Sequence, residues 1–110
     1  MHDKLLGGVV SSYLSTAHRD SPGSGCTIAA LGAEAARQGA PLRGAFTEGT
    51  KAQLEALAKL VPGATPAVRR RRAAVTLSAM VGALVLARAL DDDALSKEIL
   101  RSVRDAVAQD

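Results

Sequence analysis

The residue types that could do chemistry gather near the start of the chain: Ser12, Ser15, His18, Asp20 and Cys26. Serine, histidine and aspartate are the parts of a nucleophilic triad, and histidine with cysteine can hold a metal ion. The serines lack the G-x-S-x-G pattern that presents a nucleophile on a sharp turn. Even with His2, the possible metal ligands are too few and lack ligand spacing. We therefore expect no catalytic residue, no metal, no cofactor and no enzymatic activity.

Cys26 is the single cysteine of the chain. An intrachain disulfide is therefore impossible, which fits a reducing compartment. The first residues also lack a signal-peptide pattern, so we expect a cytoplasmic protein. We interpret Cys26 as a small buried hydrophobic residue at the start of a helix. A redox-sensing thiol is the alternative, because a helix N-terminus lowers the pKa of a thiol.

The composition favours one helical domain covering residues 1–110. The chain is 47% hydrophobic and 23% charged, proportions that are ordinary for a globular protein. Aromatic residues make up only 2% of it, and a β-sandwich would need more aromatic and β-branched residues. A core of alanine, leucine and valine suits closely packed helices. The net charge of +3 is too weak to imply a nucleic-acid partner by itself.

Helix-breaking and helix-capping residues divide the chain into five predicted helices, at about residues 3–17, 26–39, 41–61, 65–90 and 92–107. Pro41 suits the first position of the third helix. The fourth helix has the clearest start, because Thr65 can cap it and Pro66 presets its first turn. Asp92 is the predicted cap of the fifth helix. No strand-like alternation of any length is present.

Four consecutive arginines, residues 69–72, precede an uncharged run at residues 73–87. That run has 15 residues, whereas a membrane span needs about 20, so we expect no membrane span. Successive positions lie 100° apart around a helix, so the arginines sweep most of its circumference and form no one-sided DNA-reading surface. We predict a solvated basic collar at the end of a long buried helix. Contact with nucleic acid or with an acidic partner is the alternative.

Two lines of small residues at steps of four follow the arginines: Ala74, Ser78 and Gly82, and Ala79, Ala83 and Ala87. A helix that is apolar nearly all round must be covered nearly all round, which four other helices can hardly do. Self-association as a two-fold dimer is the economical solution. The last helix adds a predicted apolar stripe at Leu95, Ile99, Val103 and Val107. The predicted dimer interface comprises Ala74, Ser78, Gly82, Leu86, Leu95, Ile99 and Val103.

Three stretches together resemble the C-terminal domain of bacterial TetR-type transcriptional regulators: SSYLSTAHRDSPGSGCTIAALGAEAAR, LRGAFTEGTKAQLEALAKLVPGA and RRRRAAVTLSAMVGALVLARALDDDALSKEILRSVRDAV. The resemblance spans nearly the whole chain from Leu5 and lies in the order of these stretches. It implies an all-α, five-helix bundle that forms a homodimer through its last two helices. It also implies a small-molecule pocket among the preceding helices.

The resemblance also implies an N-terminal DNA-binding domain, yet only three residues, MHD, precede the first predicted helix. We therefore expect a dimerisation and small-molecule-sensing domain that meets DNA only through a missing N-terminal domain. Alone, it should not bind DNA specifically. A free-standing helical protein–protein interaction module is the alternative, and a Cys26 thiol sensor is the third hypothesis.

The predicted ligand-binding wall comprises Tyr13, Ala17, Phe46, Thr50, Leu54, Met80 and Leu84. Tyr13 combines an apolar ring with a hydroxyl that can orient a ligand, and Met80 adapts to irregular shapes. Thr50 follows a glycine and leaves a position without bulk between Phe46 and Leu54. Because this wall contains no acidic residue, the expected effector is mostly apolar and neutral or weakly anionic. A fully collapsed core is the alternative.

Overall fold

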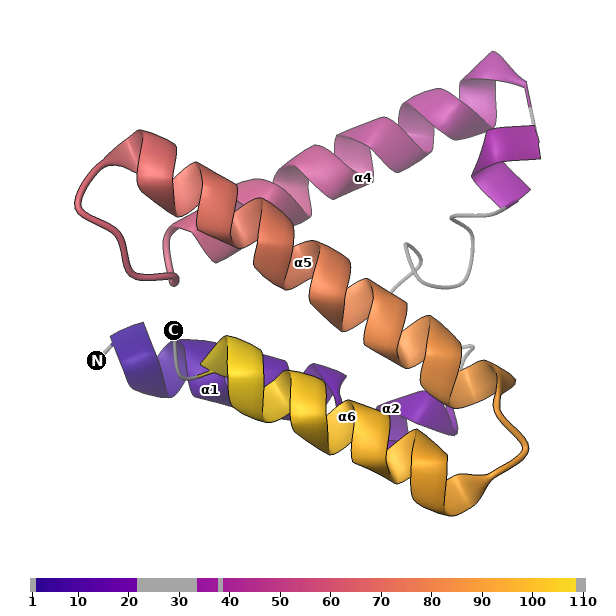
Figure 1. Ribbon diagram of the computed structural model, residues 1–110. Helices are drawn as coiled ribbons and strands as arrows, with labels where there is room; N and C mark the ends of the chain where they lie inside the picture. The colour runs from indigo at the N-terminus through magenta and orange to yellow at the C-terminus, as the bar shows by residue number, and fades with distance from the viewer. Residues whose placement is uncertain (1, 22–33, 38, 109–110) are drawn as a thin grey trace.

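The computed structural model describes residues 2–21, 34–37 and 39–108. These residues are all-α, as predicted: they form six helical segments and contain no strand. The segments are α1 (His2–Tyr13), α2 (Thr16–Arg19), a short helical stretch at 34–37, α4 (Ala40–Ala58), α5 (Pro66–Ala89) and α6 (Asp93–Ala108). The long helix α5 runs through the middle of the molecule, with α4 beside its first half and α6 returning beside its second half (Figure 1).

The first predicted helix, residues 3–17, is wrong as a single element, because the structure breaks it into α1 and α2. Ser15 adopts an extended backbone conformation, and its hydroxyl accepts a hydrogen bond from the amide of His18 at 3.1 Å. The same hydroxyl donates to the carbonyl of Ser12. Serine side chains compete with helical hydrogen bonding in this way, and here Ser15 starts a new helix. Because of this break, the described residues form six helical segments where five helices were predicted for the whole chain.

The ends of α4 follow local capping rules. Pro41 lies in the first turn, close to the predicted start, although the first helical residue is Ala40. Gly39, which was predicted to end the second helix, is the N-cap of α4. The helix ends at Ala58 rather than near residue 61, because the amide of Leu60 bonds back three residues, to the carbonyl of Leu57 at 2.9 Å. Such a tightened turn is a common end for an α-helix. Of the second predicted helix, residues 26–39, only 34–37 are described and helical, and Cys26 lies outside the described residues.

The starts of α5 and α6 confirm the sequence prediction. The Thr65 hydroxyl accepts a hydrogen bond from the amide of Val68 at 3.2 Å, and Pro66 is the first helical residue. A carboxylate oxygen of Asp92 accepts from the amide of Leu95 at 3.0 Å at the start of α6. Each cap satisfies an amide that has no partner within the helix.

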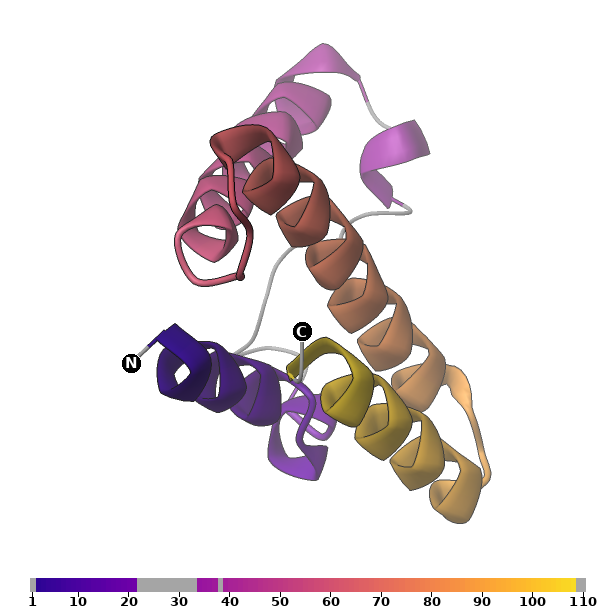
Figure 2. The ribbon, with the colours of Figure 1, turned by 60° about the vertical axis from the view of Figure 1, so that its left-hand side comes forward.

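The core lies where α1, α4, α5 and α6 meet. Its buried side chains include Leu6, Val10, Leu14, Leu57, Val61, Leu77, Met80, Ala83, Leu84, Ala87 and Leu100. On α5, Ala83 and Ala87 belong to one of the two small-residue lines, and small side chains let neighbouring helices approach closely. The two views agree that α1 and α6 lie side by side below α5 (Figures 1 and 2).

The predicted stripe of α6 lies at the edge of the core. Among its four residues, Val107 is buried, Ile99 and Val103 are half-buried and pack against the core, and Leu95 is exposed. The buried residues of α6 are Ser96, Leu100 and Val107. The three residues that we predicted at a dimer interface, Leu95, Ile99 and Val103, thus keep exposed surface, and that interface stays a prediction.

Candidate functional site

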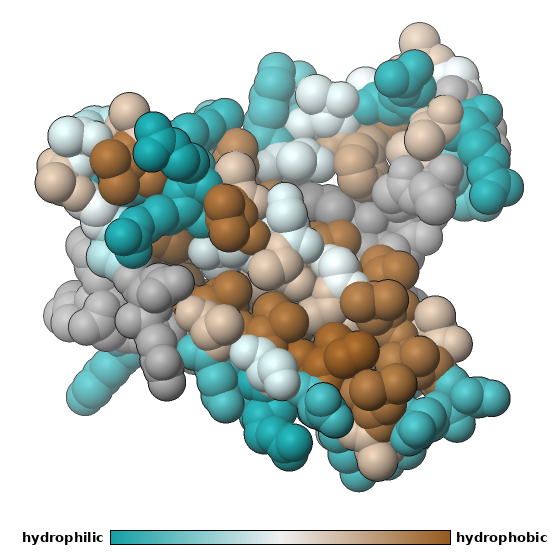
Figure 3. All heavy atoms as spheres, in the orientation of Figure 1, coloured by the Kyte–Doolittle hydropathy of each residue, from teal (hydrophilic) through white to brown (hydrophobic). Residues whose placement is uncertain are grey.

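An apolar surface extends along the exposed side of α5 and onto α6, where half-buried Ile99 and Val103 also pack against the core. We call it the α5–α6 face and define it by Ala74, Val75, Ser78, Gly82, Val85, Leu86, Ala89, Leu95, Ile99 and Val103. Val75 is 64% exposed and Leu86 is 52% exposed, which is unusual for side chains of this size on a core helix. In Figure 3, brown apolar side chains gather over the second half of α5, where it meets α6.

The helical period explains why α5 has both a buried and an exposed apolar side. Thr76, Leu77, Met80, Ala83, Leu84 and Ala87 are buried, and they recur at steps of three and four. Ala74, Ser78 and Gly82 recur at steps of four on another side and are exposed. One of the two predicted small-residue lines thus lies largely inside the fold and the other lies on its surface. All seven predicted interface residues are exposed or half-buried.

Three cationic residues of α6 lie on a different side of that helix. Lys97, Arg101 and Arg104 line a shallow hollow of about 290 Å³ together with Leu14 and Ser15. Lys97 also pairs with Asp93, its Nζ lying 3.0 Å from a carboxylate oxygen. Because these cations lie toward α1 and α2, they do not interrupt the apolar α5–α6 face.

The seven predicted ligand-binding residues are spread over several surroundings. Met80 and Leu84 are buried in the core, with exposures of 3% and 0%. Tyr13 and Leu54 are half-buried and pack against that core. Phe46 and Thr50 are half-buried on α4, and Ala17 is exposed on α2. Four hollows on the described part of the chain are lined by other residues. The predicted ligand site remains a prediction.

Two of these residues have interactions that fix their side chains. The Thr50 hydroxyl donates to the carbonyl of Phe46 at 2.9 Å, so it is held against its own helix. The Tyr13 ring packs edge-on against the His18 ring, with centroids 4.7 Å apart. The His18 ring nitrogen Nδ1 lies 2.7 Å from the carbonyl oxygen of Tyr13. His18 therefore holds the junction of α1 and α2 together.

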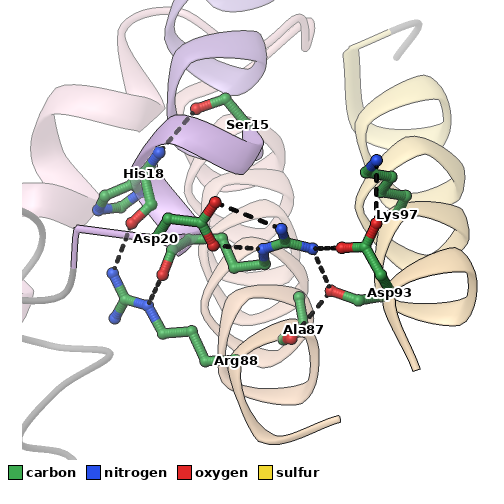
Figure 4. Close-up of polar contacts among 9 residues, drawn as sticks. Ser15, His18, Asp20, Ala87, Arg88, Asp93 and Lys97 are labelled. Atoms are coloured by element: carbon green, nitrogen blue, oxygen red, sulfur yellow. Dashed lines mark hydrogen bonds and ion pairs between the residues drawn. The ribbon is translucent and has the colours of Figure 1, made fainter. Parts of the chain in front are cut away.

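A polar network that sequence reasoning missed joins α2 to the turn between α5 and α6 (Figure 4). Its centre is Arg19, whose side chain is only 13% exposed. The guanidinium donates to carboxylate oxygens of Asp20 and Asp93, each at 2.9 Å, and to the hydroxyl of Ser96 at 2.9 Å. Ser96 in turn donates to the carbonyl of Ala87 at 2.9 Å. The Arg19 side chain thus connects α2 to α6 directly and to α5 through Ser96.

A second arginine completes this connection. Arg88, in the last turn of α5, donates to the carbonyls of His18 and Arg19 at 2.9 and 3.2 Å. A cation there also suits the negative end of the α2 helix dipole. Arg19 and Ser96 are 77 positions apart in the sequence, so no local spacing could have revealed the contact. The network explains how the four-residue helix α2 stays attached to the bundle.

Asp93 gains charge stabilisation from the same network. Hydrogen bonds from Lys97 and from Arg19 lower the pKa of Asp93 below the ordinary value for an aspartate. Hydrogen bonding to Asp20, and then to Asp93, raises the pKa of Arg19. Because the folded-state pKa of Asp93 is lowered, its contribution to stability is present above the ordinary pKa. That contribution is lost as the pH falls through the lowered value.

Replacing Ser96 by alanine is expected to lower the free energy of unfolding by about 1–3 kcal/mol, because the carbonyl of Ala87 and the Arg19 guanidinium each lose a buried partner. Ser102→Ala is the matched control, since Ser102 is exposed on the same helix. Its cost should stay within about 0.5 kcal/mol. Chemical denaturation of both variants measures the difference. Equal losses of unfolding free energy in the two variants would show that the hydrogen bonds of the Ser96 hydroxyl do not stabilise the fold.

Of the residues first considered for chemistry, Ser15 and His18 have structural contacts in the described part of the chain. Ser15 interacts with backbone groups of Ser12 and His18, and the His18 ring contacts Tyr13. Within the described residues, no group of three histidine, cysteine, aspartate or glutamate side chains is placed to hold a metal ion. The arginine run begins with half-buried Arg69 and continues with three exposed arginines, as predicted for a solvated collar.

Helix α5 is also long and apolar enough to cross a membrane, by length and composition alone. Its most apolar 18-residue window has a mean hydropathy of 1.4, and 39% of that window is buried in the fold. Buried central helices of globular proteins have the same properties. Within 2–21, 34–37 and 39–108, α5 is the one helix with these properties.

Comparison with known proteins gives no relative: no protein-family model, no curated protein and no solved structure is significantly similar to this chain.

Proposed function

We propose that this chain is the dimerisation and small-molecule-sensing domain of a TetR-like transcriptional regulator in the cytoplasm. The observation that carries the proposal is the α5–α6 face, an exposed apolar surface on the two helices that the resemblance assigns to dimerisation. A contiguous apolar patch of this kind marks a binding surface. The partner that we propose for it is a second copy of the chain.

The size of the face bears on the strength of the proposed dimer. The face runs from Ala74 to Ala89 on α5 and from Leu95 to Val103 on α6, stretches of 16 and 9 residues that correspond to lengths of about 24 Å and 14 Å. With each helix about 10 Å wide, the face presents about 380 Å² per copy, and a two-fold dimer through it would bury about 760 Å² in total. An interface of this size is typical of a weak association that depends on concentration.

The composition of the face favours an identical partner over a charged one. Its α5 portion has no charged residue, and the exposed positions Ala74, Ser78 and Gly82 carry little bulk. Two copies of such a line can cross closely around a two-fold axis, each packing the larger Val85 and Leu86 against the other. A different helical protein that used this face would make the chain an interaction module. In that case the chain would sediment as a monomer on its own.

The sensing role is tested with a ligand-induced thermal shift. A set of small apolar and aromatic compounds should include some that raise the melting temperature of the chain, because a ligand that binds only the folded state stabilises it. Thr50→Leu should abolish this shift by filling the predicted gap beside Phe46. If no compound shifts the melting temperature, the sensing role has no support.

Thr47→Leu is the control for this experiment. Thr47 lies on the same helix, and its hydroxyl donates to the carbonyl of Arg43 at 2.9 Å, as Thr50 does to Phe46. Thr47 is exposed, whereas Thr50 is half-buried. The Thr47 variant should therefore keep the shift. If both variants lost the melting-temperature shift, the substitutions would act by destabilising α4. That result would contradict the predicted site.

A further inference from the structure

The turn between α4 and α5 contains a hollow that the proposed function does not use. Its volume is about 760 Å³, and its polar wall consists of Glu55, Lys59, Arg69 and Arg70. Its apolar wall includes Val61 and Pro62 from the turn itself. Three other hollows in the described part of the chain have volumes of about 230, 450 and 290 Å³. The predicted ligand-binding residues do not line this one.

The charges around this hollow are unbalanced. Three cationic side chains face one carboxylate, and within the described residues none of the three forms an ion pair. Arg70 is exposed, and Lys59 is exposed at the end of α4. Like charges gathered around a concave surface repel one another and attract an anion from solvent. The unpaired cations and the apolar wall together suit a ligand with both an anionic and an apolar part.

Arg69 is held in place at the rim of the hollow. Its Nη1 donates to the carbonyl of Gly63 at 2.8 Å. A Cβ atom at Gly63 would lie 2.8 Å from the Cγ of Arg69 and 3.1 Å from its backbone nitrogen. Only glycine at this position leaves room for the Arg69 stem to lie against the turn. The remaining guanidinium N–H groups of Arg69 are thus positioned in advance, which lowers the entropy cost of binding.

The four consecutive arginines, residues 69–72, line two different hollows. Arg69 and Arg70 line the hollow of about 760 Å³, whereas Arg71 and Arg72 line the hollow of about 230 Å³, and the two hollows share Val61 and Pro62. Steps of 100° per residue produce this separation. Arg70 and Arg71 are therefore neighbours with equal charge and similar exposure that differ in the hollow they line.

We propose that the hollow at the α4–α5 turn binds a small organic anion, consisting of a phosphate or carboxylate group on a short apolar body. Lys59, Arg69 and Arg70 bind the anionic group through charge-assisted hydrogen bonds. Val61 and Pro62 contact the apolar body. This site is separate from the α5–α6 face and does not depend on the proposed dimer.

Titration calorimetry of the intact chain at low ionic strength tests the site, with phenyl phosphate and benzoate as anionic probes and phenol as the neutral probe. The anions should bind saturably at one site per chain, and phenol should not bind. Added salt should weaken the binding of the anions. Absence of saturable anion binding, or equally tight binding of phenol, would overturn the proposal.

The neighbouring arginines provide the matched variants. Arg70→Gln should weaken phenyl phosphate binding by about fivefold or more, because a charge-assisted hydrogen bond is lost. Arg71→Gln removes the same charge from the next residue and should change binding by less than about twofold. Equal weakening by both substitutions would mean that only the diffuse charge of the collar attracts anions. That outcome would overturn the site.

Gly63→Ala provides an independent geometric test, because the added methyl group must displace the Arg69 stem. It should weaken phenyl phosphate binding without removing any charge, while circular dichroism shows the helical content unchanged. Retained affinity in a folded Gly63→Ala variant would contradict the role of Arg69. A short DNA duplex is added as a competitor. If it binds and depends on Arg70 and Arg71 alike, the arginines serve a nucleic acid and the small-anion site is wrong.

Discussion

Replacing Gly82 by leucine is expected to convert the proposed dimer into a monomer while the fold stays intact. Gly82 is exposed on α5, and a Cβ atom added there would meet no other part of the described chain within 4 Å. Within one copy the substitution should even stabilise α5, because leucine is favoured over glycine in a helix interior by up to about 1 kcal/mol. The substitution should therefore weaken only the association between copies, because the added bulk separates helices that must approach closely.

Sedimentation and thermal unfolding of the Gly82→Leu variant measure the two effects separately. The variant should sediment as a monomer at concentrations where the unmodified chain is a dimer, and its helical circular dichroism should be unchanged. Gly44→Leu is the control, because Gly44 is also an exposed helical glycine with nothing within 4 Å of an added Cβ. It lies on α4, away from the α5–α6 face, and should leave the dimer unchanged. A Gly82→Leu dimer as tight as the original would exclude the small-residue line from the interface.

Replacing Leu84 by alanine is expected to lower the free energy of unfolding by about 2–5 kcal/mol. Leu84 has no exposed surface and lies on the buried side of α5. Truncation loses the free energy that is gained when the leucine side chain moves from water into the core. It also leaves a cavity that the surrounding helices fill only in part. Urea denaturation at one fixed protein concentration measures the loss, since the stability of a dimer depends on concentration.

Leu5→Ala is the comparison for this substitution. Leu5 is 51% exposed on α1, so the same chemical change there should cost within about 0.5 kcal/mol. A similar small cost at Leu84 would show that α5 does not have the tightly packed side described above. Because Leu84 was also predicted to line a ligand pocket, the size of the loss bears on that prediction. A large loss is typical of a close-packed core, and a small loss is typical of an open wall.

The helix starts could be predicted because their signals are local. Thr65 and Pro66 specify the start of α5 within a few residues, and Asp92 does the same for α6. The break between α1 and α2 has no proline or glycine to mark it. It depends on the Ser15 hydroxyl and on contacts of His18, and serines are common inside helices as well. One long-range contact adds to these local ones, because Arg88 of α5 donates to the carbonyl of His18, and such a contact cannot be read from local propensity.

The polar and apolar parts of the candidate sites differed in how far they could be predicted. The exposed line of small residues on α5 follows from helical periodicity, so the sequence alone places Ala74, Ser78 and Gly82 together. The Arg19–Ser96 contact joins residues 77 positions apart, and no periodicity connects them. The wall prediction placed Met80 and Leu84 beside a ligand, but apolar side chains suit a pocket and a core equally well. The burial of Ser96 could not be predicted, because serine is mostly exposed in folded proteins.

Sedimentation velocity of the unmodified chain over the micromolar range tests dimerisation through the α5–α6 face most directly. Two copies joined by about 760 Å² of largely apolar surface should sediment as a mixture of monomer and dimer, with the dimer fraction rising with concentration. A compact, folded monomer throughout that range would contradict the proposed dimer.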